Sequence, residues 1–218
     1  MREQAYFIQT GDVPGPGVLL LHSVWGLTRE VKTRADSLAD VGYTVLAPDL
    51  NFGILPVTQQ EALDHLGEAD PNRLASLVLS AAKLVHDRSS PGPIGLVGFG
   101  MGGSLALWAS VRLGDAASVA VSFYGSQQID FAGSSSSYQI HYAESDEFIS
   151  PDEAAFMEAT LALEKLETVV HRYPGTSHGF AEPESDAFDS PQFEIAWSRT
   201  LEFLDLNLGK RALTDQAG

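Results

Sequence analysis

Short apolar runs alternate with amphipathic stretches along most of the chain, and this alternation constrains the fold more than any other sequence feature. Runs that are apolar throughout are typical of strands buried on both faces. The predicted strands are 17–22, 44–49, 93–99, 118–125, 138–144 and 168–175, and the predicted helices are 28–41, 71–86, 101–113, 151–166 and 192–208. This order predicts an α/β fold with a mostly parallel sheet and helices on both faces.

Several helix boundaries carry their own signals. Thr28 has the hydroxyl expected of an N-cap, and Pro71 and Pro151 are suited to the first turn of a helix. The segment 50–70 has a mixed signal, and the segment 126–137 is rich in serine. Both segments are expected at the rim of the site, which makes any cap over it small.

Composition bounds the domain count and the partners. The 218 residues, 44% of them hydrophobic, predict one domain over 1–208 followed by a polar tail at 209–218. The formal charge of −16 makes nucleic acid and anionic membranes improbable partners, because both are bound through Lys and Arg. No run is long and apolar enough for a membrane span or a signal peptide, so the expected compartment is the cytoplasm. The sequence leaves the oligomeric state open.

The absence of cysteine excludes a disulfide scaffold, a cysteine-ligated metal site and a thiolate nucleophile. Outside the motif described below, the histidines are not at metal-ligand spacing and are interpreted as structural, so no metal is inferred. They are His22, His65, His86, His141 and His171. The acidic segment 181–190 is interpreted as a solvated loop. GFGMGG resembles a dinucleotide fingerprint, but it follows a late strand and lacks the partner acid, so no cofactor is inferred.

Chemistry-bearing residues follow three of the predicted strands, and parallel strands bring such residues to one sheet edge. A glycine-rich turn, 98–103, follows the strand 93–99. Asp146 follows the fifth strand, with Glu144 and Glu147 as rival acids, and His178 follows the sixth in a glycine-containing loop. The chain order of elbow, acid and histidine matches that of nucleophile, acid and base in α/β hydrolases.

The sequence resembles the dienelactone hydrolase family of α/β hydrolases. The matching segments are LLLHSVWGLT, GYTVLAPDL, GLVGFGMGGSLAL, HYAESDEFISP and YPGTSHGF, which together span most of 17–204 in the family's order. The resemblance implies an α/β-hydrolase fold and hydrolysis of a carboxylic ester or lactone by acyl transfer.

Carried over position by position, the resemblance implies a role for each matching residue. His178 is the implied base and Asp146 the acid that orients it, while the backbone N–H groups of Met101 and Val24 form the implied oxyanion hole. Further residues expected at the substrate pocket are Ser23, Trp25, Phe99 and Phe180.

This sequence departs from the family at three positions. Gly100 stands where the family has its nucleophile, usually cysteine, so covalent catalysis there is excluded. Ser23 stands where the family often has a glutamate. Ala181 and Glu182 lie where an arginine commonly binds a substrate carboxylate, which argues against dienelactone itself as the substrate.

Gly100 has three interpretations. Glycine relieves the backbone strain of such an elbow, so it preserves the fold while removing the chemistry. An engineered replacement is a second interpretation, although inactivating substitutions usually keep a β-carbon. Transfer of the nucleophile's role to another hydroxyl, Ser104 or Ser23, is the third.

Three function hypotheses follow. One is a hydrolase with impaired or non-standard turnover of an ester or lactone, in which His178 activates water directly. The second is a non-catalytic protein that binds a small ester, lactone or related ligand in the former active site. The third is an interaction protein that has kept the fold and abandoned the pocket.

Overall fold

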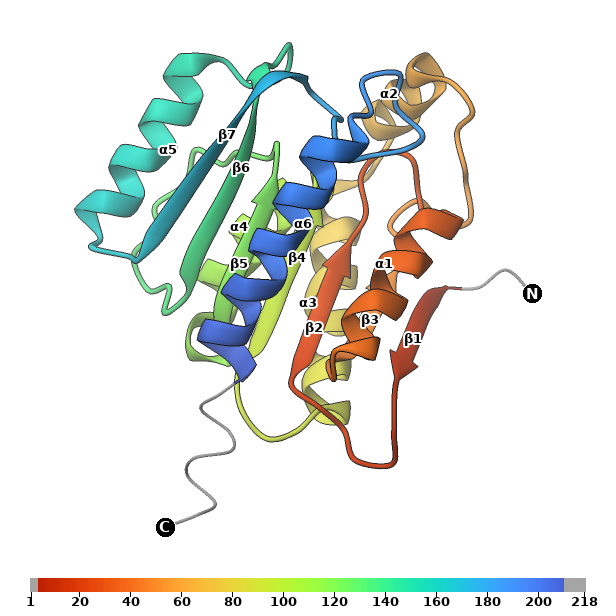
Figure 1. Cartoon of the computed structure of the whole chain (residues 1–218), viewed down its shortest axis with the longest axis vertical. Helices are drawn as coiled ribbons and strands as arrows, with labels where there is room; N and C mark the ends of the chain where they lie inside the picture. Colours follow the sequence, from red (N-terminus) through yellow and green to blue (C-terminus); the bar gives the residue numbers. More distant parts are fainter. Residues whose placement is uncertain (1–3, 210–218) are drawn as a thin grey trace.

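A seven-stranded sheet forms the centre of the molecule (Figure 1). The structure is a computed structural model, and it describes residues 4–209. The strands are β1 (Ala5–Gln9), β2 (Gly17–Leu21), β3 (Thr44–Pro48), β4 (Ile94–Phe99), β5 (Ala117–Phe123), β6 (Ser137–Ser145) and β7 (Thr168–Ser177). Their order across the sheet is β1-β3-β2-β4-β5-β6-β7, and every neighbouring pair is parallel except β1 and β3.

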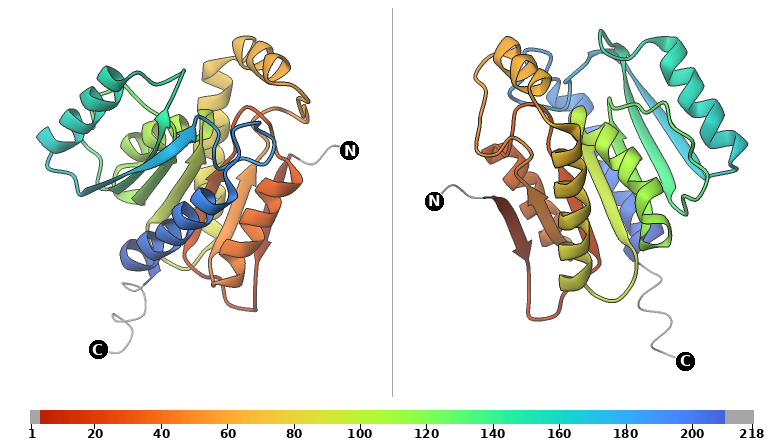
Figure 2. Two further views of the ribbon diagram at one scale, coloured as in Figure 1. Left: turned by 45° about the horizontal axis from the view of Figure 1, so that its top comes forward. Right: turned by 180° about the vertical axis from the view of Figure 1, so that it is seen from behind.

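Helices cover both faces of the sheet. They are α1 (Arg29–Asp40), α2 (Gln59–Gly67), α3 (Pro71–Arg88), α4 (Met101–Leu113), α5 (Pro151–Leu163) and α6 (Ser190–Leu204), with short helical turns η1 (Gly114–Ala116) and η2 (Asp205–Gly209). One face packs against α1 and α6, and the other against α3, α4 and α5 (Figures 1 and 2). The α2 helix sits over the end of the sheet at which the parallel strands terminate. None of the described helices is long and apolar enough to cross a membrane.

The structure confirms the predicted α/β class and the order of its main elements. Thr28 caps α1 by accepting a hydrogen bond from the Val31 N–H group, and Pro71 and Pro151 each open a helix as expected. The β1 strand was not predicted, because this short edge strand is only half buried and lacks an apolar run. The α2 helix was not predicted either, because its nine residues include one buried side chain, that of Ala62. Of the expected tail 209–218, all but Gly209 lies outside the described residues.

The turn from β4 into α4 depends on glycines that let backbone segments touch. A β-carbon on Gly102 would collide with the carbonyl oxygens of Leu21 and His22, at the end of β2. One on Gly98 would collide with the backbone of Gly102 and Gly103. The first turn of α4 therefore lies directly against the strand ends, which places its N-terminus at the carboxyl edge of the sheet.

We expect Gly102→Ala to lower the free energy of unfolding by about 2–4 kcal/mol, because the added methyl group meets rigid backbone rather than a movable side chain. Gly67→Ala is the matched control, since its β-carbon would meet no atom within 4 Å, and it should leave stability within about 1 kcal/mol of the parent. Urea unfolding measures both. Equal stability of the two variants would contradict the close approach of α4 to β2.

Candidate functional site

Gly100 lies at the apex of the turn between β4 and α4. Its backbone angles, φ 50° and ψ −116°, belong to a region that side chains rarely adopt, and its N–H donates to the Phe123 carbonyl at 2.9 Å. A β-carbon built there would lie 3.5 Å from Ser23 Cβ, 3.8 Å from His178 Nε2 and 3.9 Å from Tyr124 Cε2. These are ordinary contact distances. The turn therefore has the strained shape of a nucleophile elbow, with room for a side chain directed toward His178.

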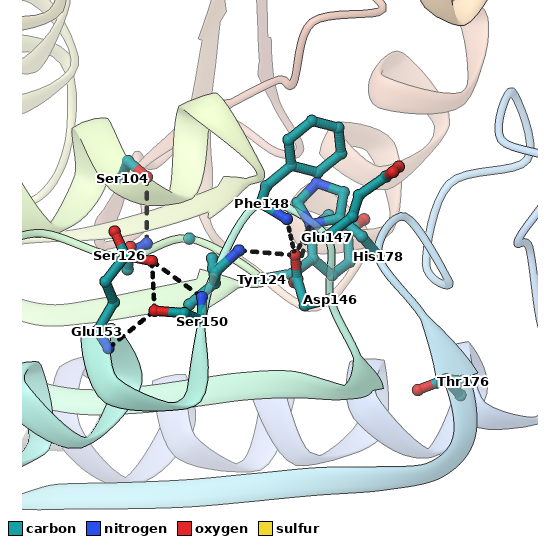
Figure 3. A network of polar contacts seen from close by, with 12 residues as sticks. Ser104, Tyr124, Ser126, Asp146, Glu147, Phe148, Ser150, Glu153, Thr176 and His178 are labelled. Carbon is teal, nitrogen blue, oxygen red and sulfur yellow. Dashed lines mark hydrogen bonds and ion pairs between the residues drawn. The ribbon is translucent and has the colours of Figure 1, made fainter.

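His178 and Asp146 form a pair across the ends of β7 and β6. His178 Nδ1 lies 2.9 Å and 3.0 Å from the two carboxylate oxygens of Asp146 (Figure 3). The same carboxylate accepts hydrogen bonds from the backbone N–H groups of Phe148 and Ile149, at 2.9 Å and 3.0 Å. With Nδ1 on the carboxylate, Nε2 is left facing Gly100. This arrangement suits a base whose tautomer is fixed by an acid.

Two aromatic rings hold the imidazole of His178. The ring centroids of Phe148 and Tyr124 lie 4.6 Å and 4.8 Å from it (Figure 3). The rival acids have other partners: Glu144 accepts from the Gly175 N–H at 2.8 Å, and Glu147 accepts from the Gln59 side chain at 3.1 Å. Among the three acids that the sequence analysis weighed, Asp146 is the one that contacts His178.

The expected oxyanion donors lie beside the elbow. Met101 is the first residue of α4, and the N–H groups of a helix's first turn have no partner within the helix. Val24 belongs to the loop after β2, and its carbonyl accepts a hydrogen bond of 2.7 Å from Asn51 Nδ2. Ser23 Oγ accepts one of 3.3 Å from the Trp25 N–H group. These bonds fix the loop next to Gly100, although the oxyanion role itself stays a prediction.

A buried carboxyl group, Glu182, lies under the elbow. One oxygen accepts a hydrogen bond from the Ser23 hydroxyl, and the other accepts one of 3.0 Å from the Tyr124 hydroxyl. Burial raises the pKa of Glu182, while the bond from Ser23 and the nearby Arg34 guanidinium oppose the rise. Arg34 itself donates to the Ala181 carbonyl and stacks on the ring of Phe99 at 4.4 Å.

The interpretation of 181–190 as a solvated loop was wrong at Glu182, whose residue is only 5% exposed. A proline and further acids surround Glu182 in sequence, so the local composition predicts an exposed side chain. The fold buries this side chain and supplies two hydroxyl donors to its carboxyl group, from Ser23 and Tyr124. Two sequence signals linked this acid to the site: its short spacing from His178, and its place where the family commonly has a substrate-binding arginine.

A cavity of about 650 Å³ opens above these groups. It is lined by residues from six segments: Ser23, Val24, Trp25, Val57, Thr58, Gln59, Leu63, Leu66, Gly100, Met101, Tyr124, Ser145, Glu147, Phe148, Ile149, Ser177, His178, Gly179, Glu182, Glu184, Ser185, Asp186 and Ala187. The segment 50–70 thus supplies one wall, as expected. Of the described lining residues none comes from 126–137, so that expectation was wrong. The loop 182–187 takes its place.

Two of the expected pocket residues lie in the core instead. Phe99 is 1% exposed and stacks on Phe123, with ring centroids 4.5 Å apart. Phe180 is fully buried between Tyr124 and Tyr173. Both residues are close to the site in sequence, but the local backbone directs their side chains into the core between the sheet and the helices α1 and α6. Ser104 also lies away from the elbow, where its hydroxyl accepts from the Ser126 N–H at 3.2 Å (Figure 3).

His22 ties the ends of β2 and β3 together beside the site. Its Nε2 accepts from the Leu50 N–H at 2.8 Å, so Nδ1 carries the proton and donates to the Ser23 carbonyl at 2.6 Å. Burial lowers the pKa of His22 from 6.5 to about 4, and the bond to Ser23 opposes this only in part. Protonation would break the bond from Leu50, so the folded state favours the neutral ring.

Stability should therefore fall as the pH drops from about 6.5 to about 4, because the unfolded chain takes up the proton on His22 first. The contribution of His22 is about 3 kcal/mol, fully present above this window and lost at its lower end. Urea unfolding across the window measures it. His22→Gln should reduce the pH-dependent loss in the free energy of unfolding by that amount, whereas His86→Gln, on the exposed surface of α3, should leave the loss unchanged. If the free energy of unfolding depended on pH equally in the two variants, His22 would not be its source.

We expect Gly100→Ala to lower the free energy of unfolding by about 1–3 kcal/mol through backbone strain, since the added β-carbon has room. The methyl group should leave the fold intact, as judged by circular dichroism. Gly67→Ala serves again as the unstrained control. A variant as stable as the parent would mean that the turn relaxes out of the elbow conformation.

Comparisons with known proteins identify the family of this chain. The family model of the dienelactone hydrolase family matches residues 4–208. The chain is 29% identical over 209 residues to Protein usf of Aquifex pyrophilus, covering 90% of each chain. It is 24% identical over 206 residues to a carboxymethylenebutenolidase of Pseudomonas putida, covering 88% of this chain and 86% of the other.

Solved structures share the fold. A dienelactone hydrolase-like promiscuous phosphotriesterase from metagenomic libraries superposes with a TM-score of 0.81 at 20% identity, over 94% of this chain and 92% of the other. The match to the family model covers nearly every described residue, and the fold and chain order agree with it. The chain therefore belongs to the dienelactone hydrolase family.

Proposed function

We propose that this protein hydrolyses a carboxylic ester or lactone with a water molecule as the nucleophile, activated by His178. The observation that carries the proposal is the position of His178 Nε2, 3.8 Å from where a β-carbon on Gly100 would lie. The Asp146–His178 pair is thus aimed at the space that a nucleophilic side chain would fill. A water molecule there would be within reach of a general base.

In the proposed reaction, His178 Nε2 takes a proton from water as the water oxygen attacks the substrate carbonyl carbon. Asp146 keeps the imidazole oriented and stabilises its positive charge. The developing oxyanion accepts hydrogen bonds from the N–H groups of Met101 and Val24. The intermediate then collapses, and His178 returns the proton to the leaving alkoxide. Without a covalent intermediate, turnover is expected to be slow.

A second candidate is a protein that binds such a ligand without turnover. It is favoured by the combination of a preserved cavity of about 650 Å³ with glycine at the apex of the turn. A cavity of this size suits a small molecule. In this case the loss of the nucleophile protects the ligand.

Hydrolysis of p-nitrophenyl acetate separates the two candidates. We expect the parent to hydrolyse it slowly above the buffer rate, and His178→Ala to abolish that rate. Gly100→Cys should be about 10²–10⁴-fold faster than the parent, because the thiol would lie beside His178. Gly100→Ala, which fills the same space without adding a nucleophile, is the matched control and should stay at or below the parent.

Mass spectrometry of the quenched reaction provides the second readout. An acyl adduct is expected on the introduced thiol and not on the parent. An adduct on the parent chain would contradict direct attack by water and would direct attention to Ser23. Activity confined to Gly100→Cys would favour the binding protein. If no variant hydrolysed the ester although the fold was intact, the proposed alignment of His178 with position 100 would be contradicted.

A further inference from the structure

The cavity walls carry an excess of negative charge. Four carboxyl side chains line it: Glu147, Glu182, Glu184 and Asp186. Among the described residues that line it, none is lysine or arginine. The imidazole of His178, which also lines the cavity, is held by the Asp146 carboxylate. A ligand in this cavity therefore meets a negative electrostatic potential.

The four carboxyl groups differ in burial, since Glu182 is buried while Glu147 and Asp186 are exposed. Glu182 accepts hydrogen bonds from Ser23 and Tyr124, whose side chains lie 3.5 Å and 3.9 Å from where a β-carbon on Gly100 would lie. Burial is the main cause of the raised pKa of both Glu182 and Tyr124, and the Glu184 carboxylate adds to both. Glu182 and Glu184 both line the cavity, so both carboxyl groups face the same ligand.

The buried guanidinium group of Arg34 does not cancel the negative charge of the cavity lining for a ligand. Arg34 is 6% exposed and does not line the cavity. Its guanidinium group donates to the Ala181 carbonyl and lies between the rings of Phe99 and Phe193, at 4.4 Å and 4.9 Å from their centroids. The positive charge of Arg34 therefore acts on Glu182 from the protein interior. A ligand carboxylate in the cavity cannot contact the guanidinium group, because Arg34 does not line the cavity.

Aromatic rings complete the lining. Trp25, Tyr124 and Phe148 line the cavity, and Phe148 is 44% exposed and in contact with His178. Ring faces attract cations through the aromatic quadrupole, most strongly for tryptophan. Carboxylates and rings in one cavity form a combination that favours an ammonium group and disfavours a carboxylate.

We propose that the cavity selects acyl compounds that carry a cationic group, such as esters of amino alcohols, and rejects those that carry a carboxylate. The inference rests on the proposed function, because it assumes that the ester group lies at His178 and Gly100. The cationic end is then bound by the carboxyl groups of Glu184 and Asp186 and by the aromatic rings that line the same cavity.

Three acetate esters of similar shape test the charge preference. Acetylcholine is the cation, 3,3-dimethylbutyl acetate is its neutral carbon isostere, and 3-acetoxypropanoate is the anion. Binding to the parent protein is measured by NMR titration of the Trp25 indole resonance at low and high salt. We expect acetylcholine to bind about 5–10-fold more tightly than the neutral isostere at low salt, and the anion to bind most weakly. High salt should shrink the difference.

Charge-removing variants locate the source of the preference. Glu184→Gln/Asp186→Asn should reduce the ratio of cation to neutral affinity to within about twofold and leave neutral binding unchanged. Asp12 lies between β1 and β2 and Asp40 ends α1, both at the edge of the sheet where the parallel strands begin. Asp12→Asn/Asp40→Asn therefore removes the same number of charges far from the cavity and should leave the ratio unchanged. Glu147→Gln is a third variant, on the other wall, in case the double variant fails to fold.

The outcomes separate the inference from the function on which it rests. Equal binding of cation and neutral isostere, or tightest binding of the anion, overturns the charge preference while leaving the hydrolase proposal intact. A preference that falls equally in both double variants overturns the assignment to the cavity wall. Failure of all three esters to bind at millimolar concentrations contradicts the inference and the proposed ligand class together.

Discussion

The close approach of α4 to the strand ends is the constraint on which the rest of the site depends. It brings the N-terminus of a helix to the carboxyl edge of the sheet, next to the loop after β2. The approach requires glycine where the backbones touch, at Gly98 and Gly102. Once these contacts form, the residue at the apex of the turn has little conformational freedom. Gly100 adopts φ 50° without the steric penalty that a side chain would meet there.

A second set of contacts holds the histidine independently of that apex. Asp146 is fixed by two backbone N–H groups and presents its carboxylate to His178. The imidazole is enclosed by the rings of Tyr124 and Phe148. Because none of these bonds involves a side chain at position 100, the pair of Asp146 and His178 holds its geometry with glycine at the apex of the turn.

Glu182 connects these two parts of the site. Its carboxyl group is buried under the apex and bound by the hydroxyls of Ser23, after β2, and Tyr124, after β5. A buried carboxyl group is stable only with such partners, and the nearby Arg34 offsets its charge. This carboxyl group is one of four that line the cavity. Glu182 thus joins three segments of the fold at the wall of the candidate site.

The sequence by itself determined the α/β class, most element boundaries and the pairing of His178 with Asp146 as candidates. Those features reside in local patterns, namely uniformly apolar strands, capping residues and chain order around the strand ends. The tertiary structure decided which side chains are buried, where they point and which segments line the cavity. It buried Glu182 despite its polar surroundings, directed Phe99 and Phe180 into the core, and formed a cavity wall from 182–187 rather than from 126–137. The physical reason is that burial and side-chain direction depend on contacts between segments distant in the chain, which no single stretch of sequence contains.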